Sequence, residues 1–291
     1  MTARSLANEI ATLKLFSLPD VVLRLNELLQ SPYATNAEIG EVLMSDPALS
    51  ARTLKLANSA LYALSSKVET MSKAVILLGR NAIRNLAFTT YVTHAFKGIP
   101  SEWVDMDRFW LNSLACGVIA RSLAFRCKLF DNEHLFMAGL LHKVGRLMFY
   151  CSRPEEYREV LLVKDRGEAE MLRAEERVFG FTHAELGAEL LRLWKLPERL
   201  CTVVAHYPAP LASMEHRHEV AIVHVASVLA YCIEPGVDIP QDIDPESIAF
   251  DHETWDVLNL SKEIIPTVIQ DAWVQTFEIL EIIKPNLTLI Y

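Results

Sequence analysis

Helical periodicity runs through almost all of this 291-residue chain and most limits what it can fold into. Apolar residues recur at spacings of three and four, which places them on one side of a helix and leaves the other side polar. We find no convincing pair of segments in which apolar and polar residues alternate, as they do in half-buried strands. The chain is therefore predicted to be all-α, and it is long enough to bury a substantial core.

Residues that satisfy the free backbone groups at helix ends mark several helix starts. In a capping box, a Thr or Ser side chain and a Glu three residues later each bind the other's backbone N–H. An Asp before a proline supplies an N-cap and a first helical residue. Such start signals occur at Thr35–Glu38, Asp46–Pro47, Ser152–Glu155 and Thr182–Glu185.

The helices change in character near residue 98. Before this point they are short, and Gly79 is predicted to end one of them. After the interruption at Gly98-Ile99-Pro100, predicted helices span 109–125 and 133–150, the second apolar on nearly all sides. We therefore predict two packed helical subdomains, a bundle of short helices over residues 1–98 and a second helical bundle over residues 99–291.

Composition excludes several classes of function. With 28 Lys and Arg against 37 Asp and Glu, the net charge of -9 argues against a nucleic-acid partner. No apolar run approaches the roughly 20 residues that span a bilayer, and the N-terminal segment lacks the features of a signal peptide, so we expect a cytoplasmic protein with no membrane contact. The five cysteines form no close pair, and no phosphate loop or dinucleotide fingerprint occurs, so no cofactor is predicted.

Three histidines, His142, His183 and His206, lie on three different predicted helices, each near a helix end or a glycine. Imidazole is the commonest metal ligand, and metal sites in helical bundles gather ligands from facing helices. None of the three has the short repeat spacing of a metal-binding motif, so spacing alone favours ordinary capping or core histidines.

The chain resembles the HDOD family, the HD-related output domains of bacterial signalling proteins, over roughly residues 14 to 230. The resemblance rests on an ordered series of short motifs: Leu18-Pro19, Ser45-Asp46-Pro47-Ala48-Leu49, Leu56-Ala57-Asn58-Ser59-Ala60, Ala74-Val75-Ile76-Leu77-Leu78-Gly79, Phe109-Trp110, Ala138-Gly139-Leu140-Leu141-His142, Gly180-Phe181-Thr182-His183-Ala184 and Trp194-Lys195-Leu196-Pro197. It implies that the second subdomain is a bundle like that of the HD phosphohydrolases.

The resemblance also implies where the divalent metal of active HD enzymes would be held. Carried over one by one, the positions fall at Asn112, His142, Lys143, His183, His206-Tyr207 and Ser227. Lys143 stands where the His-Asp pair has its aspartate, and Ser227 stands at the closing aspartate. Both carboxylates that the family pattern calls for are therefore replaced.

Lys143 decides what this set of residues can do. Its ammonium only donates hydrogen bonds and repels a cation, so we predict no metal and no catalytic residue here. The family pattern points to Glu175 as the acid that pairs with Lys143 in place of the metal. A lysine that reaches past the cleft to solvent is the alternative.

These observations lead to an expected function. We expect a non-catalytic regulatory protein that acts by binding other proteins, and the resemblance implies bacterial signalling partners, such as those of cyclic-dinucleotide or two-component pathways. One alternative is a residual metal-dependent phosphohydrolase, which requires the three histidines to converge with an acid. Another is a sensor that binds a nucleotide or other anion through Lys143 and the histidines.

Overall fold

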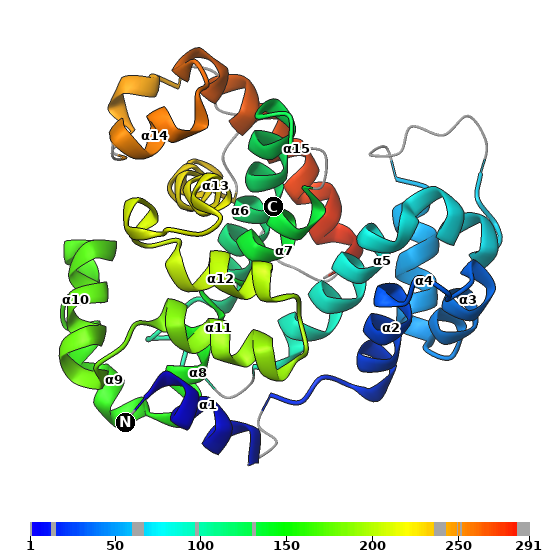
Figure 1. The fold of residues 1–291 in the computed structure, drawn as a ribbon, viewed down its shortest axis with the longest axis horizontal. Coiled ribbons are helices and arrows are strands. Elements are labelled where there is room, and N and C mark those ends of the chain that lie inside the picture. The colour runs from blue at the N-terminus through cyan, green and yellow to red at the C-terminus, as the bar shows by residue number, and fades with distance from the viewer. Residues whose placement is uncertain are drawn as a thin grey trace. The chain divides into compact units, whose positions relative to one another are not determined.

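The computed structural model describes residues 2–12, 16–59, 67–96, 99–129, 132–235, 243–248, 250 and 252–283. Throughout these ranges the chain forms α-helices joined by turns and short 3-10 helices, and none of the described residues is in a strand (Figure 1). The predicted all-α class is confirmed.

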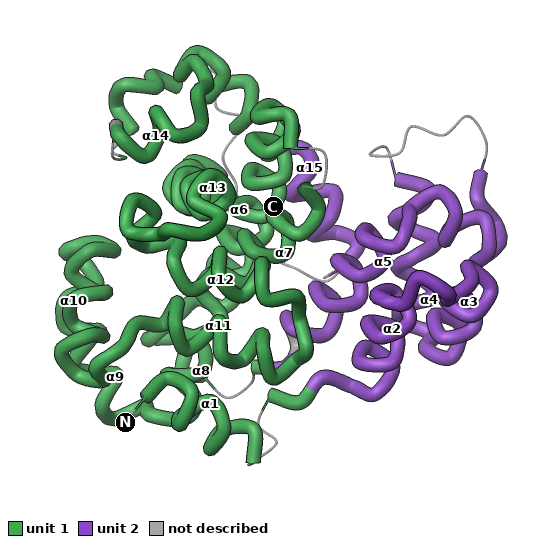
Figure 2. The backbone as a smooth tube through the Cα atoms, in the orientation of Figure 1, with its two compact units in different colours: residues 1–17, 96–272 green, residues 18–95, 273–291 purple. Residues whose placement is uncertain are grey.

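Two compact units divide the chain (Figure 2). The first comprises residues 1–17 and 96–272, and the second comprises residues 18–95 and 273–291. The predicted subdomains were residues 1–98 and residues 99–291. In the structure, residues 1–17 belong instead to the unit that contains residues 96–272, and residues 273–291 belong to the unit that contains residues 18–95. At the N-terminal end, α1 (Ala3–Thr12) packs on α11 (His183–Leu193) of the first unit, and the Trp194 indole N–H donates to the carbonyl of Phe16 at 3.0 Å.

The second unit is built from short helices: α2 (Asp20–Gln30), α3 (Asn36–Met44), α4 (Pro47–Ala57) and α5 (Met71–Ala95), with the end of α15 (Ile265–Ile283). The Asp46 carboxylate caps α4 by accepting from the N–H of Leu49 at 2.9 Å. Within α5 the backbone bends at Gly79, whose φ of 73° lies in the left-handed region that glycine adopts readily. The predicted helix end at Gly79 is thus a bend between two helical stretches.

Local capping signals predicted most of the helix starts correctly. Thr35 with Glu38 and Thr182 with Glu185 both form complete capping boxes. The predicted cap at Ser152 is wrong, because its hydroxyl donates to the carbonyl of Met148 at 2.7 Å and the next helix starts two residues later. A serine at the end of one helix can bind back to that helix instead of capping the next one.

The first unit comprises α1, α6 (Met106–Arg126), α7 (Glu133–Leu141), α8 (Val144–Ser152), α9 (Pro154–Leu161), α10 (Glu168–Phe179), α11, α12 (Glu198–His206), α13 (Arg217–Leu229), α14 (His252–Leu258) and the start of α15. Most of them are no longer than the helices of the second unit, so the expected increase in helix length after residue 98 is wrong. Helices α6, α7 and α13 pack on one another, α11 packs on α8 and α12, and α10 packs mainly on α9. In Figure 1, α9 and α10 lie at the edge of this unit.

The helix predicted over residues 133–150 is two helices, α7 and α8, with a break at His142 and Lys143. The His142 ring nitrogen Nδ1 lies 2.6 Å from the carbonyl oxygen of Gly139. In an unbroken helix this carbonyl would accept from the backbone N–H of Lys143, so the histidine side chain competes with the helix for it. Periodicity could not reveal the break, because both helices are buried and apolar on nearly all sides.

Glycines allow two pairs of helices to approach closely around this break. A Cβ on Gly139 of α7 would lie 2.7 Å from backbone atoms of Gly117 on α6. A Cβ on Gly145 of α8 would clash with the carbonyl oxygen of His183 and lie 2.7 Å from the N–H nitrogen of Gly187, both on α11. These two contacts fix the turn between α7 and α8 against α6 on one side and α11 on the other.

We predict that Gly139→Ala destabilises the protein by about 1–3 kcal/mol, because the added methyl group meets backbone atoms that can yield only by separating α6 from α7. Gly40→Ala is the matched control, since a Cβ there meets only the flexible Met71 side chain at 3.7 Å and alanine favours the helix. Urea unfolding of both variants checks the prediction. Equal stabilities would show that α6 and α7 can move apart freely.

Candidate functional site

The turn between α7 and α8 places three polar side chains in the interior of the first unit. His142, Lys143 and Arg146 are 0%, 5% and 6% exposed. Lys143 and Arg146 are three residues apart, the spacing that puts neighbours on the same face of a helix. Two cationic side chains therefore enter the unit from the start of α8, where Gly145 brings that helix against α11.

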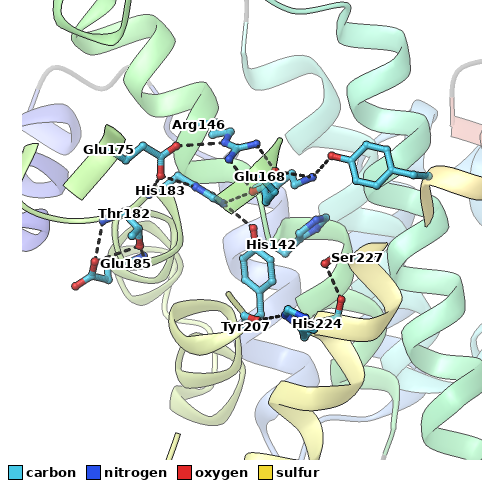
Figure 3. Close-up of polar contacts among 12 residues, drawn as sticks. His142, Arg146, Glu168, Glu175, Thr182, His183, Glu185, Tyr207, His224 and Ser227 are labelled. Carbon is cyan, nitrogen blue, oxygen red and sulfur yellow. Dashed lines mark hydrogen bonds and ion pairs between the residues drawn. The ribbon is translucent and has the colours of Figure 1, made fainter. Parts of the chain in front are cut away.

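Arg146 lies between two glutamates of α10, as Figure 3 shows. Its Nη1 and Nη2 donate to the two carboxylate oxygens of Glu168 at 3.1 and 2.7 Å, and its Nε donates to Glu175 at 3.3 Å. The side chain of Glu175 is fully buried, whereas that of Glu168 is 35% exposed. Arginine suits this position, because its planar guanidinium presents several donors in a fixed geometry.

Glu175 also organises the first turn of α11. One carboxylate oxygen accepts from both the backbone N–H and the ring Nδ1 of His183, at 2.8 and 2.7 Å, and the other accepts from the Tyr157 hydroxyl at 2.5 Å. Because Nδ1 carries the proton, the other ring nitrogen of His183 is an acceptor, and it receives the hydroxyl of Tyr207 at 2.6 Å. Both nitrogens of His183 are therefore engaged within the protein (Figure 3).

Burial and charge set the protonation of this network. Burial raises the pKa of Glu175, but His183, Arg146 and the hydrogen bonds that it accepts outweigh this effect and lower the pKa to about 2. Burial lowers the pKa of His183, and the attraction of Glu175 offsets only part of that shift. The network thus contains an ionised Glu175 and a neutral His183.

His142 differs from His183 in having an unused ring nitrogen. Its Nδ1 donates to the Gly139 carbonyl, so Nε2 carries the lone pair, and this buried atom has no hydrogen-bond partner among the described residues. Burial and the nearby Lys143 charge lower the pKa of His142 well below its usual value. Its ring meets the Tyr207 ring edge-on, with the ring centroids 5.0 Å apart.

Lys143 pairs with Glu168 and not with the predicted Glu175. Its ammonium lies 3.8 Å from a Glu168 oxygen and donates to the hydroxyl of Tyr231 at 2.6 Å. The prediction of Glu175 is wrong because Arg146, which the sequence analysis did not single out, occupies that carboxylate. The alternative of a lysine that reaches solvent is also wrong, because Lys143 is only 5% exposed.

The structure brings only part of the predicted set together. His142 and His183 both contact Tyr207, but His206, the last residue of α12, is exposed and takes no part in this network, so the three histidines do not converge. The Ser227 hydroxyl donates within α13 to the carbonyl of His224 at 2.7 Å.

Asn112 lies on α6 with a partly exposed side chain. It is four residues before the fully buried Cys116, which places the two residues on the same face of α6.

Sequence reasoning missed four residues of the network: Arg146, Glu168, Tyr157 and Tyr231. Arg146 carried a usable signal, because it is a charged residue inside a long apolar run, three positions from Lys143. Charged residues in such a run are rarely buried unless they are paired. Tyr157 and Glu168 carried no such signal, since α9 and α10 have the polar composition of surface helices.

The residues present do not fit the divalent metal that HD enzymes hold. Neutral imidazole nitrogens and carboxylates are the donors that such a site requires. The free nitrogen of His183 accepts from Tyr207, both glutamates are bound by Arg146, and Lys143 adds a positive charge. In the described part of the chain, no group of three His, Cys, Asp or Glu side chains is arranged to hold a metal ion.

This chain is similar in sequence and in fold to known proteins. The family model of the HDOD domain matches residues 15–210. A protein of Treponema pallidum (strain Nichols) that is named only as uncharacterized is 25% identical over 249 residues, which covers 83% of this chain and 47% of that protein. The chain thus spans about half the length of this curated relative. Among the described helices, none is both long and apolar enough to cross a membrane.

Solved structures share the fold. An HDOD domain protein of unknown function from Geobacter sulfurreducens superposes with a TM-score of 0.73 at 28% identity, covering 96% of this chain and 97% of that one. A protein of Shewanella amazonensis SB2B, whose name proposes a phosphohydrolase, gives 0.76 at 24% identity, with coverage of 96% and 98%. A protein of Marinobacter aquaeolei VT8, whose name proposes signal transduction, gives 0.70 at 22%, with coverage of 94% and 60%.

We predict that Arg146→Met lowers the free energy of unfolding by about 3–5 kcal/mol, because it leaves Glu175 buried and ionised without its cation. The control is Arg173→Met on α10, where the ion pair with Glu170 is largely in solvent and contributes little. Urea unfolding at pH 7.5 compares the two. A loss no larger than that of the control would show that the Arg146 bridge is dispensable.

Stability is also predicted to fall as the pH drops below about 6.5, the usual pKa of histidine in an unfolded chain. Because the pKa values of His142 and His183 are lowered in the folded protein, the unfolded chain binds protons at mildly acidic pH that the folded protein does not bind. Their contribution is therefore complete above pH 6.5 and is lost as the pH falls, by about 1–3 kcal/mol in total at pH 5.5.

Urea unfolding at pH 7.5 and pH 5.5 measures this loss. The lowered pKa of Glu175 acts only at more acidic pH, so it does not contribute in this range. His142→Gln should reduce the pH dependence. A stability that is unchanged between the two pH values would contradict the neutral state of both rings.

Proposed function

The chain belongs to the HDOD family, and we propose that it is a regulatory protein without catalytic activity that acts by binding other proteins. The observation that carries the proposal is the contact between His183 and Tyr207. Nε2 of His183 is the nitrogen that would bind a metal, and the Tyr207 hydroxyl donates to it at 2.6 Å. An HD-type metal would have to displace a hydrogen bond that is fully buried.

Charge supports the same proposal. Metal catalysis needs an ion that lowers the pKa of a bound water, and positive charges beside the site weaken the binding of such an ion. Here the positions beside His142 and His183 carry the ammonium of Lys143 and the guanidinium of Arg146, which together balance the charges of Glu168 and Glu175. The two positive and two negative side chains therefore balance one another without a bound ion.

Exposed apolar side chains support partner binding. The second unit exposes Tyr33 and Ile76 by 90% and 66%, and it also exposes Met44 and Leu77. Ile76 and Leu77 lie on α5, which packs on α3, the helix that ends with Met44. Large apolar groups at a surface provide contact area for another protein. The proposed partners are signalling proteins, such as those of cyclic-dinucleotide or two-component pathways. Capture of bound proteins from the native cell tests this part of the proposal.

We predict that Lys143→Asp does not create hydrolysis of cyclic or linear nucleotides. The new carboxylate would lie beside Glu168, while Asn112 and Ser227 still could not replace the missing ligands, and Tyr207 would still occupy His183. The measurement is a phosphodiesterase assay with added Mn²⁺, run on the wild type, Lys143→Asp and Lys143→Met.

Lys143→Met is the control because it removes the charge without adding a ligand. Turnover by Lys143→Asp well above that of Lys143→Met would sink the proposal and favour the residual phosphohydrolase. Stoichiometric Zn, Mn or Fe in wild-type protein purified without a chelator would do the same.

A further inference from the structure

The second unit contains an open groove with a volume of about 700 Å³. It lies between the end of α4, the segment 67–69 before α5 and the end of α15, and its described lining residues all belong to this unit (Figure 2). Val68 and Ile282, each only 4% exposed, form an apolar floor together with Leu54. The groove is therefore large and apolar enough to take side chains of another molecule.

Asn58, which follows α4, holds one wall of the groove in an extended conformation. Its side-chain amide donates to the carbonyl of Val68 and accepts from the N–H of Val68, each at 2.8 Å. The N–H and C=O of one residue point to the same side only where the backbone is extended, as in a hydrogen-bonded pair of an antiparallel sheet. Asn58 therefore takes the place of a neighbouring strand on one edge of the segment 67–69.

The opposite edge of this segment is open. Backbone groups of successive residues in an extended chain point to opposite sides, so those of Lys67 and Glu69 point away from Asn58. These backbone groups make no hydrogen bond with any residue that the structure describes, and both residues line the groove. An unpaired edge of this kind accepts a further extended chain as an added strand.

Charge in the groove determines which kind of chain it accepts. Glu69 lies on the extended wall, and Glu278 and Glu281, three residues apart and so on one face of α15, lie on another. None of these carboxylates pairs with a cation in the described part of the chain. The lining also has two lysines, Lys55 and Lys67, but the ammonium of Lys55 donates to the backbone carbonyl of Glu281 at 3.1 Å. Three carboxylates against two lysines, one of them engaged, favour a cationic ligand.

We propose that this groove binds an extended segment of a partner protein in which arginine or lysine alternates with apolar residues. The backbone of that segment pairs with the open edge at Lys67 and Glu69. Side chains of an extended chain point alternately to opposite faces, so the apolar ones cover the floor while the basic ones reach the carboxylates.

This inference rests on the partner binding proposed above, and it gives the contact segment of the partner a chemistry. The two can fail separately. Metal content and nucleotide hydrolysis test whether the protein is a regulator without catalytic activity, whereas direct binding of a synthetic peptide tests the groove.

The probe is a fluorescent peptide of alternating valine and arginine, Val-Arg-Val-Arg-Val-Arg-Val, and fluorescence anisotropy measures its binding to the full chain at pH 7.5 and physiological ionic strength. We expect it to bind at least about ten-fold more tightly than the same peptide with glutamate in place of arginine. A third peptide keeps the arginines but has a methyl group on every inner backbone nitrogen. It should bind at least about ten-fold more weakly than the first, because it cannot donate to the open edge.

A pair of variants locates the binding. Glu281→Lys reverses one charge in the groove and should weaken binding of the arginine peptide by about five-fold or more. Glu41→Lys is the matched control, because Glu41 is an exposed glutamate of α3 in the same unit and does not line the groove. It changes the net charge equally and should leave the affinity unchanged.

Each other outcome would overturn the proposal. Equal weakening by the two substitutions would indicate attraction to the net charge of the whole chain. Undiminished binding of the methylated peptide would exclude strand addition, and equally tight binding of arginine amide alone would assign the groove to a small cation. No binding of the arginine peptide up to about 1 mM would show that the groove takes no such segment. The peptide comparisons use the wild type, so they stand even if a variant fails to fold.

Discussion

The bridge that Arg146 makes between Glu168 and Glu175 is the interaction on which the interior of the first unit depends. Helix α10 packs mainly on α9, and it is linked to α8 by these two carboxylates and by Phe179, whose ring stacks on that of Phe149. Glu175 in turn fixes the ring of His183, and His183 fixes the hydroxyl of Tyr207. One guanidinium thus sets the positions of side chains on α8, α10, α11 and the end of α12.

Two cationic side chains, Lys143 and Arg146, hold Glu168 and Glu175 inside the first unit without a metal ion being needed to balance their charges. A metal ion imposes a coordination geometry and leaves a position for water. Arginine and lysine impose no such position, and their side chains fill the space between the helices. The fold alone therefore does not determine which kind of group lies between these helices.

Local signals predicted the helices well, and long-range contacts explain what they missed. The capping boxes at Thr35 and Thr182 depend on a few neighbouring residues, so the sequence shows them directly. At Gly79 the sequence indicated a helix end, whereas the structure has a bend between two helical stretches. The break after α7 depends on a side chain that competes with the backbone inside a uniformly apolar segment, which periodicity cannot detect.

The candidate site shows the same limit. The resemblance located His142, Lys143 and His183. It predicted an ion pair between Lys143 and Glu175, however, and it did not indicate Arg146, which pairs with Glu175 in the structure. The carboxylates lie some 20 to 30 residues along the chain from Arg146, on a helix with surface composition, so the pairing could be known only from the fold. Tyr207 was included as the second position of the pair His206-Tyr207, and it is the member of that pair that engages His183, whereas His206 is exposed.

The division of the chain into two discontinuous units has a consequence for synthesis. The chain passes between the units after residues 17, 95 and 272. During translation, the segment 18–95 emerges long before residues 273–283, whose carbonyl groups at Glu281 and Ile283 accept from Lys55 and Arg52 of α4. The first helix, α1, can likewise form its contacts with α11 only after α11 has left the ribosome. Neither unit can therefore complete its contacts before the segment around residue 272 has been synthesised, and neither can be obtained whole by cutting the chain once.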